Sequence, residues 1–280
     1  MNRVLLPFLV LATLIAPSAA KAQGVLVAPH AVIMDHRTRS GSLTLYNPGD
    51  EPAEVTLSAI FGYPVTDSTG NFELKTVDQP DPDYPSAAKW VDAFPKRVLL
   101  EPKTRQTVRL LARPPANLQD GEYWARLVIS AKGGTVPVTG IADSSGVRVA
   151  LSLEIRTIIP LQYRKGKVAT GIRTSGLAAA VEKDSLAVRV RLDRTGNAAF
   201  LGTLRGALID STGRLVASVS SPLAVYYDME PRLTAPLPVA GLPAGRYRLK
   251  VDVAAQREDL APELVLATPA IRDSLEVRLP

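Results

Sequence analysis

The longest regular pattern in the chain is the alternation of apolar and polar residues over 147–164. The apolar residues at odd positions are Val147, Val149, Leu151, Leu153, Ile155, Ile159 and Leu161. Side chains of a β-strand point alternately to its two faces, so this pattern predicts one strand with an apolar row and a polar row. An ordinary strand has about 5–6 residues. This strand therefore either crosses a bent or two-sheet core, or it offers part of its apolar row to another molecule.

Shorter apolar or alternating runs occur in both halves of the chain. They predict strands at 25–34, 42–46, 53–63, 96–100, 107–112 and 120–130, and at 186–192, 200–209, 214–219, 224–227, 247–253 and 273–279. Pro29 interrupts the first run, which is typical of an edge strand or of a strand that changes sheet. Polar, Gly-rich or Pro-rich segments predict loops at 67–85 and 131–146.

One short motif occurs in both halves. Leu118-x-x-Gly121-x-Tyr123 is repeated as Leu242-x-x-Gly245-x-Tyr247, each time before a predicted strand. A tyrosine at this place is typical of the tyrosine corner of immunoglobulin-like sandwiches. The pattern predicts an all-β fold with two tandem immunoglobulin-like β-sandwich domains. The break at 165–167 places them at 23–165 and 166–280.

The first 22 residues are typical of a signal peptide. Arg3 precedes an apolar run at 4–15, and Ala20-Lys21-Ala22 offers small residues for cleavage after Ala22. The alternative is a retained N-terminal anchor, but the apolar run is short for a membrane span. No later stretch approaches about 20 apolar residues, so we expect an exported protein whose mature part is not inserted in a membrane.

Charge and composition narrow the classes of function. The chain has 33 Lys and Arg and 27 Asp and Glu, a net charge of +6, and removal of Arg3 and Lys21 leaves 31 against 27, or +4. The charges are interspersed, with no dense basic run among aromatic residues, so we expect no nucleic-acid partner. The absence of cysteine excludes disulfides, thiol catalysis and zinc–thiolate sites.

Signals for enzymatic chemistry are absent. The chain has no G-x-S-x-G, H-E-x-x-H, P-loop or G-x-G-x-x-G motif, and its only histidines are His30 and His36. Asp78, Asp81 and Asp83 lack the ligand spacing of a calcium loop, which favours a solvated loop. We therefore expect no enzyme, no cofactor and no metal site.

Four segments carry a resemblance to a known family. They are 29–47, 90–113 with its run KRVLLEPKTRQTVRLLAR, 120–127 with DGEYWARL, and the end of the long strand, Leu161-Gln162-Tyr163-Arg164. With them the chain resembles the PapD-like periplasmic chaperones of the chaperone-usher pilus pathway. The resemblance covers the first half well. It covers the second half only through architecture and the Gly245-x-Tyr247 turn.

The resemblance implies a function and a place for it. Such chaperones act in the periplasm, hold pilus or fimbrial subunits whose sandwich lacks a strand, lend them a strand, and deliver them to an outer-membrane usher. Here the lent segment is 149–155, and its apolar row is Val149, Leu151, Leu153 and Ile155. No catalytic residue is required. An exposed edge of this kind also predicts self-association of the free protein.

The anchor for the subunit's C-terminal carboxylate departs from the family pattern. The resemblance places a basic residue at or beside His30 and another at Pro160, and neither is kept. Protonated His30, Arg156 or Arg164 remain as candidate anchors, although Arg156 also fits a solvated strand face. The alternative function is a secreted two-domain immunoglobulin-like adhesin or surface-complex binding protein, in which the long strand is purely structural.

Overall fold

The computed structural model describes residues 24–137 and 150–279. The predicted signal peptide at 1–22 and the predicted strand residue Val149 lie outside the described residues. The described chain is built of strands, with two short 3-10 turns, Val239–Gly241 (η1) and Pro262–Leu264 (η2). None of its helical segments has the length and apolar character needed to cross a membrane.

The first sandwich consists of β1–β10. Their bounds are β1 (Leu26–Ala28), β2 (Val32–Asp35), β3 (Ser40–Tyr46), β4 (Ala53–Thr66), β5 (Phe72–Val77), β6 (Val91–Phe94), β7 (Arg97–Leu100), β8 (Arg105–Ala112), β9 (Gly121–Pro137) and β10 (Ala150–Lys165). One sheet has the order β1-β3-β8-β6 and the other β2-β10-β9-β4-β5, with β7 paired to β4. Between the sheets lies an apolar core that includes Leu43, Val108 and Leu161.

The second sandwich consists of β11–β18. Their bounds are β11 (Thr170–Glu182), β12 (Ser185–Gly196), β13 (Phe200–Ile209), β14 (Leu215–Val225), β15 (Asp228–Met229), β16 (Arg232–Pro236), β17 (Gly245–Ala254) and β18 (Ile271–Leu279). One sheet is β11-β12-β15, with β16 also paired to β12, and the other is β14-β13-β17-β18. Its core includes Val190, Phe200 and Leu249. The predicted all-β fold with two tandem sandwiches is confirmed.

Both predicted tyrosine corners are present. The Tyr123 hydroxyl donates to the carbonyl of Gln119 at 3.0 Å, and the Tyr247 hydroxyl donates to the carbonyl of Pro243 at 2.8 Å. This bond back to an upstream carbonyl is a hallmark of immunoglobulin-like sandwiches. The glycines of the two motifs also share an unusual φ, 156° at Gly121 and 151° at Gly245, which explains why the motif repeats with glycine.

The predicted change of sheet at Pro29 is confirmed. β1 pairs antiparallel with β3 in one sheet, whereas β2 pairs in parallel with β10 in the other. The N-terminal segment therefore joins both layers of the first sandwich, and β2 fixes the last residues of β10.

Several strands were not predicted. The expected loop at 67–85 contains β5, whose exposed, polar-rich sequence is held as a strand by its pairing with β4. The expected loop at 131–146 is wrong at its start, because β9 continues to Pro137; residues 138–146 lie outside the described residues. β11 is rich in Ala, Gly and Thr and becomes a strand by pairing with β12. β6 and β16 are also additional, and the strands expected at 214–219 and 224–227 form the single strand β14.

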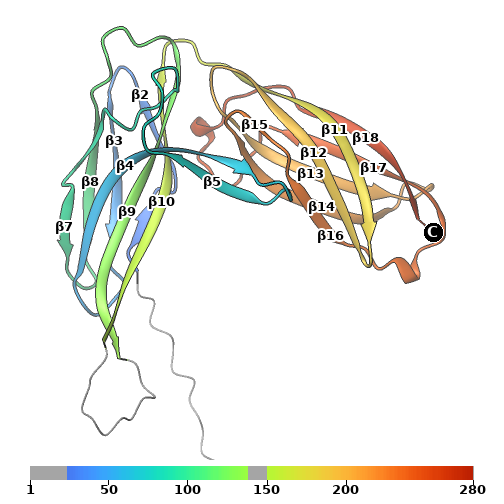
Figure 1. Cartoon of the computed structure of the whole chain (residues 1–280), viewed down its shortest axis with the longest axis horizontal. Helices are drawn as coiled ribbons and strands as arrows, with labels where there is room; N and C mark the ends of the chain where they lie inside the picture. Colours follow the sequence, from blue (N-terminus) through green and yellow to red (C-terminus); the bar gives the residue numbers. More distant parts are fainter. Residues whose placement is uncertain (1–23, 138–149, 280) are drawn as a thin grey trace, which may run out of the picture.

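The two sandwiches are inclined to each other, and the β4–β5 hairpin crosses between them (Figure 1). At its tip, the amide of Arg232 donates to the carbonyl of Gly70 at 3.0 Å, and the amide of Glu230 donates to the Thr66 hydroxyl at 2.8 Å. A buried cluster of Phe61, Tyr63, Trp124, Ala199 and Tyr226 joins the sandwiches beside the hairpin. β10 ends at Lys165 and β11 begins at Thr170, so the covalent connection is short.

Candidate functional site

β10 has an open edge over most of its length. On one side it pairs antiparallel with β9 from Ala150 to Lys165. On its other side β10 pairs with β2, and this pairing begins only at Leu161. Among the described residues no strand pairs with this second edge over 150–160. The open edge presents unpaired backbone N–H and C=O groups, which are a template for adding a strand.

The apolar row of β10 leaves the core along this open edge. Ile159, Leu161 and Tyr163 are buried in the first sandwich, whereas Ile155 is half-buried and Leu153 is 40% exposed. β10 pairs with β9 through Leu151, but the side chain of Leu151 lies outside the described part of the chain, as does Val149. The predicted row therefore has a core half and a half that a partner can reach.

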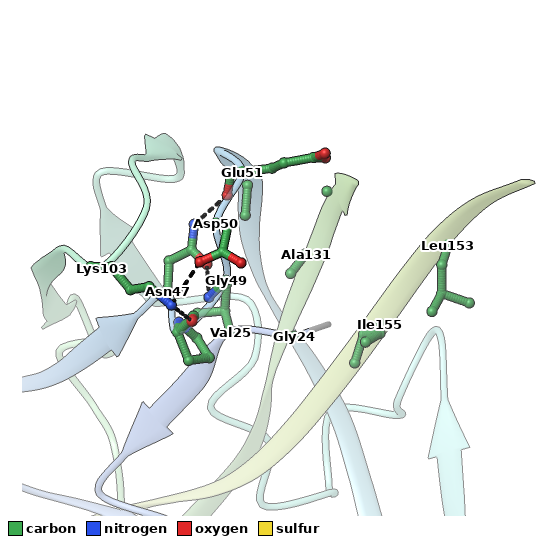
Figure 2. Close-up of a pocket in the computed structure, with 13 residues that line it drawn as sticks. Gly24, Val25, Asn47, Gly49, Asp50, Glu51, Lys103, Ala131, Leu153 and Ile155 are labelled. Atoms are coloured by element: carbon green, nitrogen blue, oxygen red, sulfur yellow. Dashed lines mark hydrogen bonds and ion pairs between the residues drawn. The ribbon is translucent and has the colours of Figure 1, made fainter. Parts of the chain in front are cut away.

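Leu153 and Ile155 also line a pocket of about 240 Å³ at the end of the sandwich remote from the second one. Figure 2 shows both side chains projecting from β10, with Ala131 on the neighbouring strand and the 47–51 turn across the pocket. Gly24 approaches the row so closely that a Cβ there would lie 3.2 Å from Cδ1 of Ile155. The two sheets are thus open at this end, beside the free edge.

The rim of this pocket is polar and hydrogen-bonded. The buried Asn47 amide donates to the carbonyls of Glu51 at 2.8 Å and Leu100 at 2.9 Å, and its oxygen accepts from the amide of Gly49 at 2.9 Å. Lys103 donates to the carbonyl of Pro48 at 2.5 Å and lies 3.0 Å from the Asp50 carboxylate. The apolar row therefore has a fixed polar border.

The opposite face of β10 is solvated. Arg156 is 67% exposed, and its Nε lies 3.0 Å from Oε1 of Glu154. The hydrogen bond from Arg156 holds the pKa of Glu154 below its usual value. Ile158 on the same face is 42% exposed.

His30 lies at a second place, between the sandwiches. It lines a hollow of about 310 Å³ together with Asp259, Glu263 and Leu264 of the second sandwich. Asp259 is engaged by Arg257 through contacts of 2.7 and 2.6 Å, and these hydrogen bonds hold the pKa of Asp259 below its usual value. Arg156 does not line this hollow.

The side chain of Arg164 makes its hydrogen bonds at the junction of the two sandwiches. Its Nε donates to Oε2 of Glu122 at 2.8 Å, and its Nη1 and Nη2 donate to the carbonyls of Glu263 at 3.0 Å and Leu264 at 2.7 Å. Oε1 of Glu122 accepts from Nε1 of Trp124 at 2.8 Å and from the amide of Ala199 at 3.0 Å. Three of these bonds join the two sandwiches, namely those from Nη1 and Nη2 of Arg164 and that from the amide of Ala199, while the Arg164–Glu122 pair orients the side chains that make them.

Aromatic rings complete the junction. The ring centroids of Trp124 and Tyr226 are 4.6 Å apart, and those of Tyr63 and Tyr227 are 4.7 Å apart. Burial raises the pKa of Tyr226 and of Tyr227, because the phenolate form is disfavoured away from water. The tyrosines therefore stay neutral.

The structure separates the candidate residues into four places, of which the solvated face of β10 holds Arg156. Leu153 and Ile155 lie at the open edge, His30 lies in the hollow between the sandwiches, and Arg164 lies in the junction. Sequence reasoning missed Glu122 and the pocket's 47–51 turn. The signal for Glu122 was a second alternating row on β9, Glu122-x-Trp124-x-Arg126, in which charged and aromatic residues share a face. Within 24–137 and 150–279, no group of His, Asp and Glu side chains is arranged to hold a metal ion.

No protein-family model matches the chain, and no curated protein matches its sequence. Among solved structures, the chain is similar to one titled as the Salmonella enterica SafA pilin in complex with the SafB chaperone, at 15% identity and a TM-score of 0.42, over 92% of this chain and 99% of that chain. It is similar to the CsuC–CsuE chaperone–tip subunit complex of Acinetobacter baumannii, at 11% identity and a TM-score of 0.45, over 90% and 98%. It is also similar to the Pseudomonas aeruginosa CupB2 chaperone, at 13% identity and a TM-score of 0.43, over 91% and 100%. With TM-scores below 0.5, these similarities assign no partner to this chain.

Proposed function

We propose that this chain is a periplasmic chaperone that binds pilus or fimbrial subunits by donating the segment 149–155, which includes the start of β10, and passes them to an outer-membrane usher. The observation that carries the proposal is the open edge of β10 over 150–160, along which the apolar row leaves the core. The resemblance of the sequence to PapD-like chaperones, described above, supports the same function.

The energetics favour an apolar contact backed by main-chain hydrogen bonds. Burying a side chain such as Leu153 in a partner contributes about 1.5–3 kcal/mol, from which the cost of ordering the two chains is subtracted. Backbone bonds to the open edge add affinity with little sequence dependence, while the alternate side chains supply specificity. The mechanism needs no catalytic group.

Among the three candidate anchors for the subunit's carboxylate, His30 has the best position. It lines the hollow between the sandwiches, whereas Arg156 is bonded to Glu154 and Arg164 to Glu122. A protonated His30 can donate to a carboxylate there. The nearby carboxylates of Asp259 and Glu263 oppose a second negative charge, so this anchor is weaker than a pair of basic residues.

The test is coexpression with a pilin-like subunit that copurifies from the periplasm and is identified by mass. We expect Leu153→Glu to leave the protein folded, because Leu153 is already 40% exposed, and to weaken subunit binding at least about tenfold, because a carboxylate would be buried in the complex. The matched control is Ile158→Glu, an equally exposed apolar residue on the other face of β10.

Two outcomes would contradict the proposal. One is a wild-type chain that retains no subunit, and the other is a Leu153→Glu variant that retains it as well as the Ile158→Glu control. In the same assay, His30→Gln is expected to weaken binding less than Leu153→Glu. If His30→Gln binds the subunit as well as the wild type, only the role of His30 as an anchor is contradicted.

A further inference from the structure

The outer face of the sheet β14-β13-β17-β18 is strongly basic. In β17, Tyr247, Leu249, Val251 and Val253 are buried, so the residues between them point outward. The pairings of β17 with β13 and β18 extend this outer face to both neighbours. Its cations, which define the basic face, are Arg205, Arg246, Arg248, Lys250, Arg272 and Arg278.

The carboxylates on the basic face do not balance these cations. Asp252 lies 3.9 Å from Arg205 and 3.2 Å from Arg272, and Glu276 lies 3.8 Å from Arg246 and 3.5 Å from Arg278. Six cations minus these two carboxylates leave +4 on one face.

Two of the cations have no partner. The side chains of Arg248 and Lys250 make no ion pair or hydrogen bond with any of the residues that the structure describes. Because Arg248 and Lys250 are exposed and unpaired, their charges are available to an external anion.

The other sheet of the same sandwich gives the contrast. Its outer side carries Arg173, Arg189, Arg191 and Arg232 against Glu182, Asp193, Asp228 and the adjoining Glu230. Three of these arginines are in ion pairs with these carboxylates. Within the second sandwich, the larger excess of positive charge therefore lies on the basic face.

A hollow and an exposed leucine lie at one end of the basic face. The hollow has a volume of about 400 Å³, and the charged residues that line it are three cations, Arg246, Arg248 and Lys250, and two carboxylates, Asp210 and Glu276. Leu215 pairs across the strands with Ile209, which in turn pairs with Arg248, so the three side chains share the outer face. Leu215 is 58% exposed.

We propose that the basic face binds peripherally to a membrane surface of anionic phospholipid. Cations spread over β13, β17 and β18 match a plane of lipid phosphates, and the hollow beside Arg248 and Lys250 has room for a headgroup. Leu215 is placed to enter the interfacial layer. The outward positions of these strands carry no aromatic residue among those described, which disfavours a specific protein interface, because such interfaces have an aromatic or apolar centre.

The experiment is cosedimentation with lipid vesicles, using the chain from residue 23 to residue 280. One set of vesicles is phosphatidylcholine alone, and the other contains phosphatidylglycerol in addition. We expect binding only to the anionic set. We also expect binding to fall as NaCl rises from about 0.1 to 1 M, because the Debye length shortens from about 10 to 3 Å.

The double variant Arg248→Gln and Lys250→Gln is expected to weaken binding at least about tenfold, since each basic residue near an anionic surface contributes several-fold. Glutamine avoids placing a like charge opposite Glu276, so the fold is kept. The matched control is Lys89→Gln with Arg109→Gln, two exposed cations of the first sandwich that remove the same charge from elsewhere. Equal weakening by the control attributes binding to net charge and overturns the proposal.

Two further outcomes also overturn it. Equal binding to neutral and anionic vesicles would mean that the charges of the basic face do not determine vesicle binding. Binding to neither vesicle, together with capture of an acidic protein that the double variant abolishes, would assign the basic face to a protein partner. The basic face is separate from β10, so this test does not depend on subunit binding.

Discussion

Glu122 is fully shielded from water, and its carboxyl group is paired with the guanidinium of Arg164. Its side chain has 0% exposure, and Arg164, the Trp124 indole and the amide of Ala199 satisfy its two oxygens. Burying a carboxylate is costly unless it is paired and hydrogen-bonded, and here both conditions are met. Because the donors come from both sandwiches, this one residue couples their relative position to the fold of each.

Glu122→Gln is expected to lower the free energy of unfolding by about 3 kcal/mol, the scale of breaking a buried ion pair. The glutamine oxygen can still accept from Trp124 and Ala199, but its NH₂ would face the Arg164 donor. Urea denaturation followed by tryptophan fluorescence measures the loss.

Arg156→Ala is the control for a surface pair. Its ion pair with Glu154 is exposed, so we expect a change of no more than about 1 kcal/mol. Equal losses in the two variants would show that the junction does not depend on the charge of Glu122.

At the scale of the element, the sequence was most informative where one face is buried. The alternation over 147–164 predicted β10, because burial of one face of a strand requires an apolar residue at every second position. Pro29 predicted the change of sheet, because proline lacks the backbone N–H that an inner strand uses. The apolar part of the candidate site followed from the same row. These features needed no knowledge of distant contacts.

Other elements and contacts could not be predicted for a physical reason. β5 is exposed along nearly its whole length and β11 along much of it, so each exists through backbone pairing with a neighbour and not through an apolar face. The same holds for the site. The 47–51 turn and Gly24 reach the pocket through folding. The alternating row on β9 marks the face that carries Glu122, but the pairing of Glu122 with Arg164 depends on the contact of β9 with β10.

Two turns of identical sequence allow a matched test of the β4–β5 hairpin. Asp67-Ser68-Thr69-Gly70 and Asp210-Ser211-Thr212-Gly213 share their hydrogen bonds, and φ is 91° at Gly70 and 88° at Gly213. A Cβ at Gly70 would lie 2.5 Å from Cβ of Arg232, whereas one at Gly213 meets nothing within 4 Å.

Gly213→Ala should therefore cost only the backbone strain, about 1 kcal/mol, while Gly70→Ala should cost at least about 1 kcal/mol more. The extra loss measures the contact of the hairpin with the second sandwich. Urea unfolding of both variants provides the comparison, and equal losses would mean that the hairpin tip does not hold the sandwiches together.

At the scale of the whole molecule, an apolar edge and a basic face lie on different sandwiches. The open edge of β10 belongs to the first, and the basic face belongs to the second. Without its first 22 residues the chain has 31 basic and 27 acidic residues, a net charge of +4, so two copies repel each other at low ionic strength. Added salt should therefore weaken the binding of anions to the basic face, because it screens their attraction. It should strengthen association of two copies through the open edge of β10, because it screens their repulsion.

We expect the free protein to self-associate through the open edge of β10, with two copies related by a twofold axis. Sedimentation velocity should show a dimer fraction that grows with protein concentration and with added NaCl. Leu153→Glu should reduce it, because like charges would then meet at the pairing edge, whereas Ile158→Glu on the solvated face should not. A strictly monomeric protein at high concentration would exclude this mode of association.

Pro160 sits between the open part of β10 and the part paired with β2. Proline has no N–H, and within a sheet its nitrogen is tolerated only on an unpaired edge. A strand added along 150–159 therefore finds no donor at Pro160, just before Leu161 meets Val32 of β2. An incoming strand therefore lacks one backbone hydrogen bond at this residue, which disfavours its extension into the part of the edge that β2 occupies.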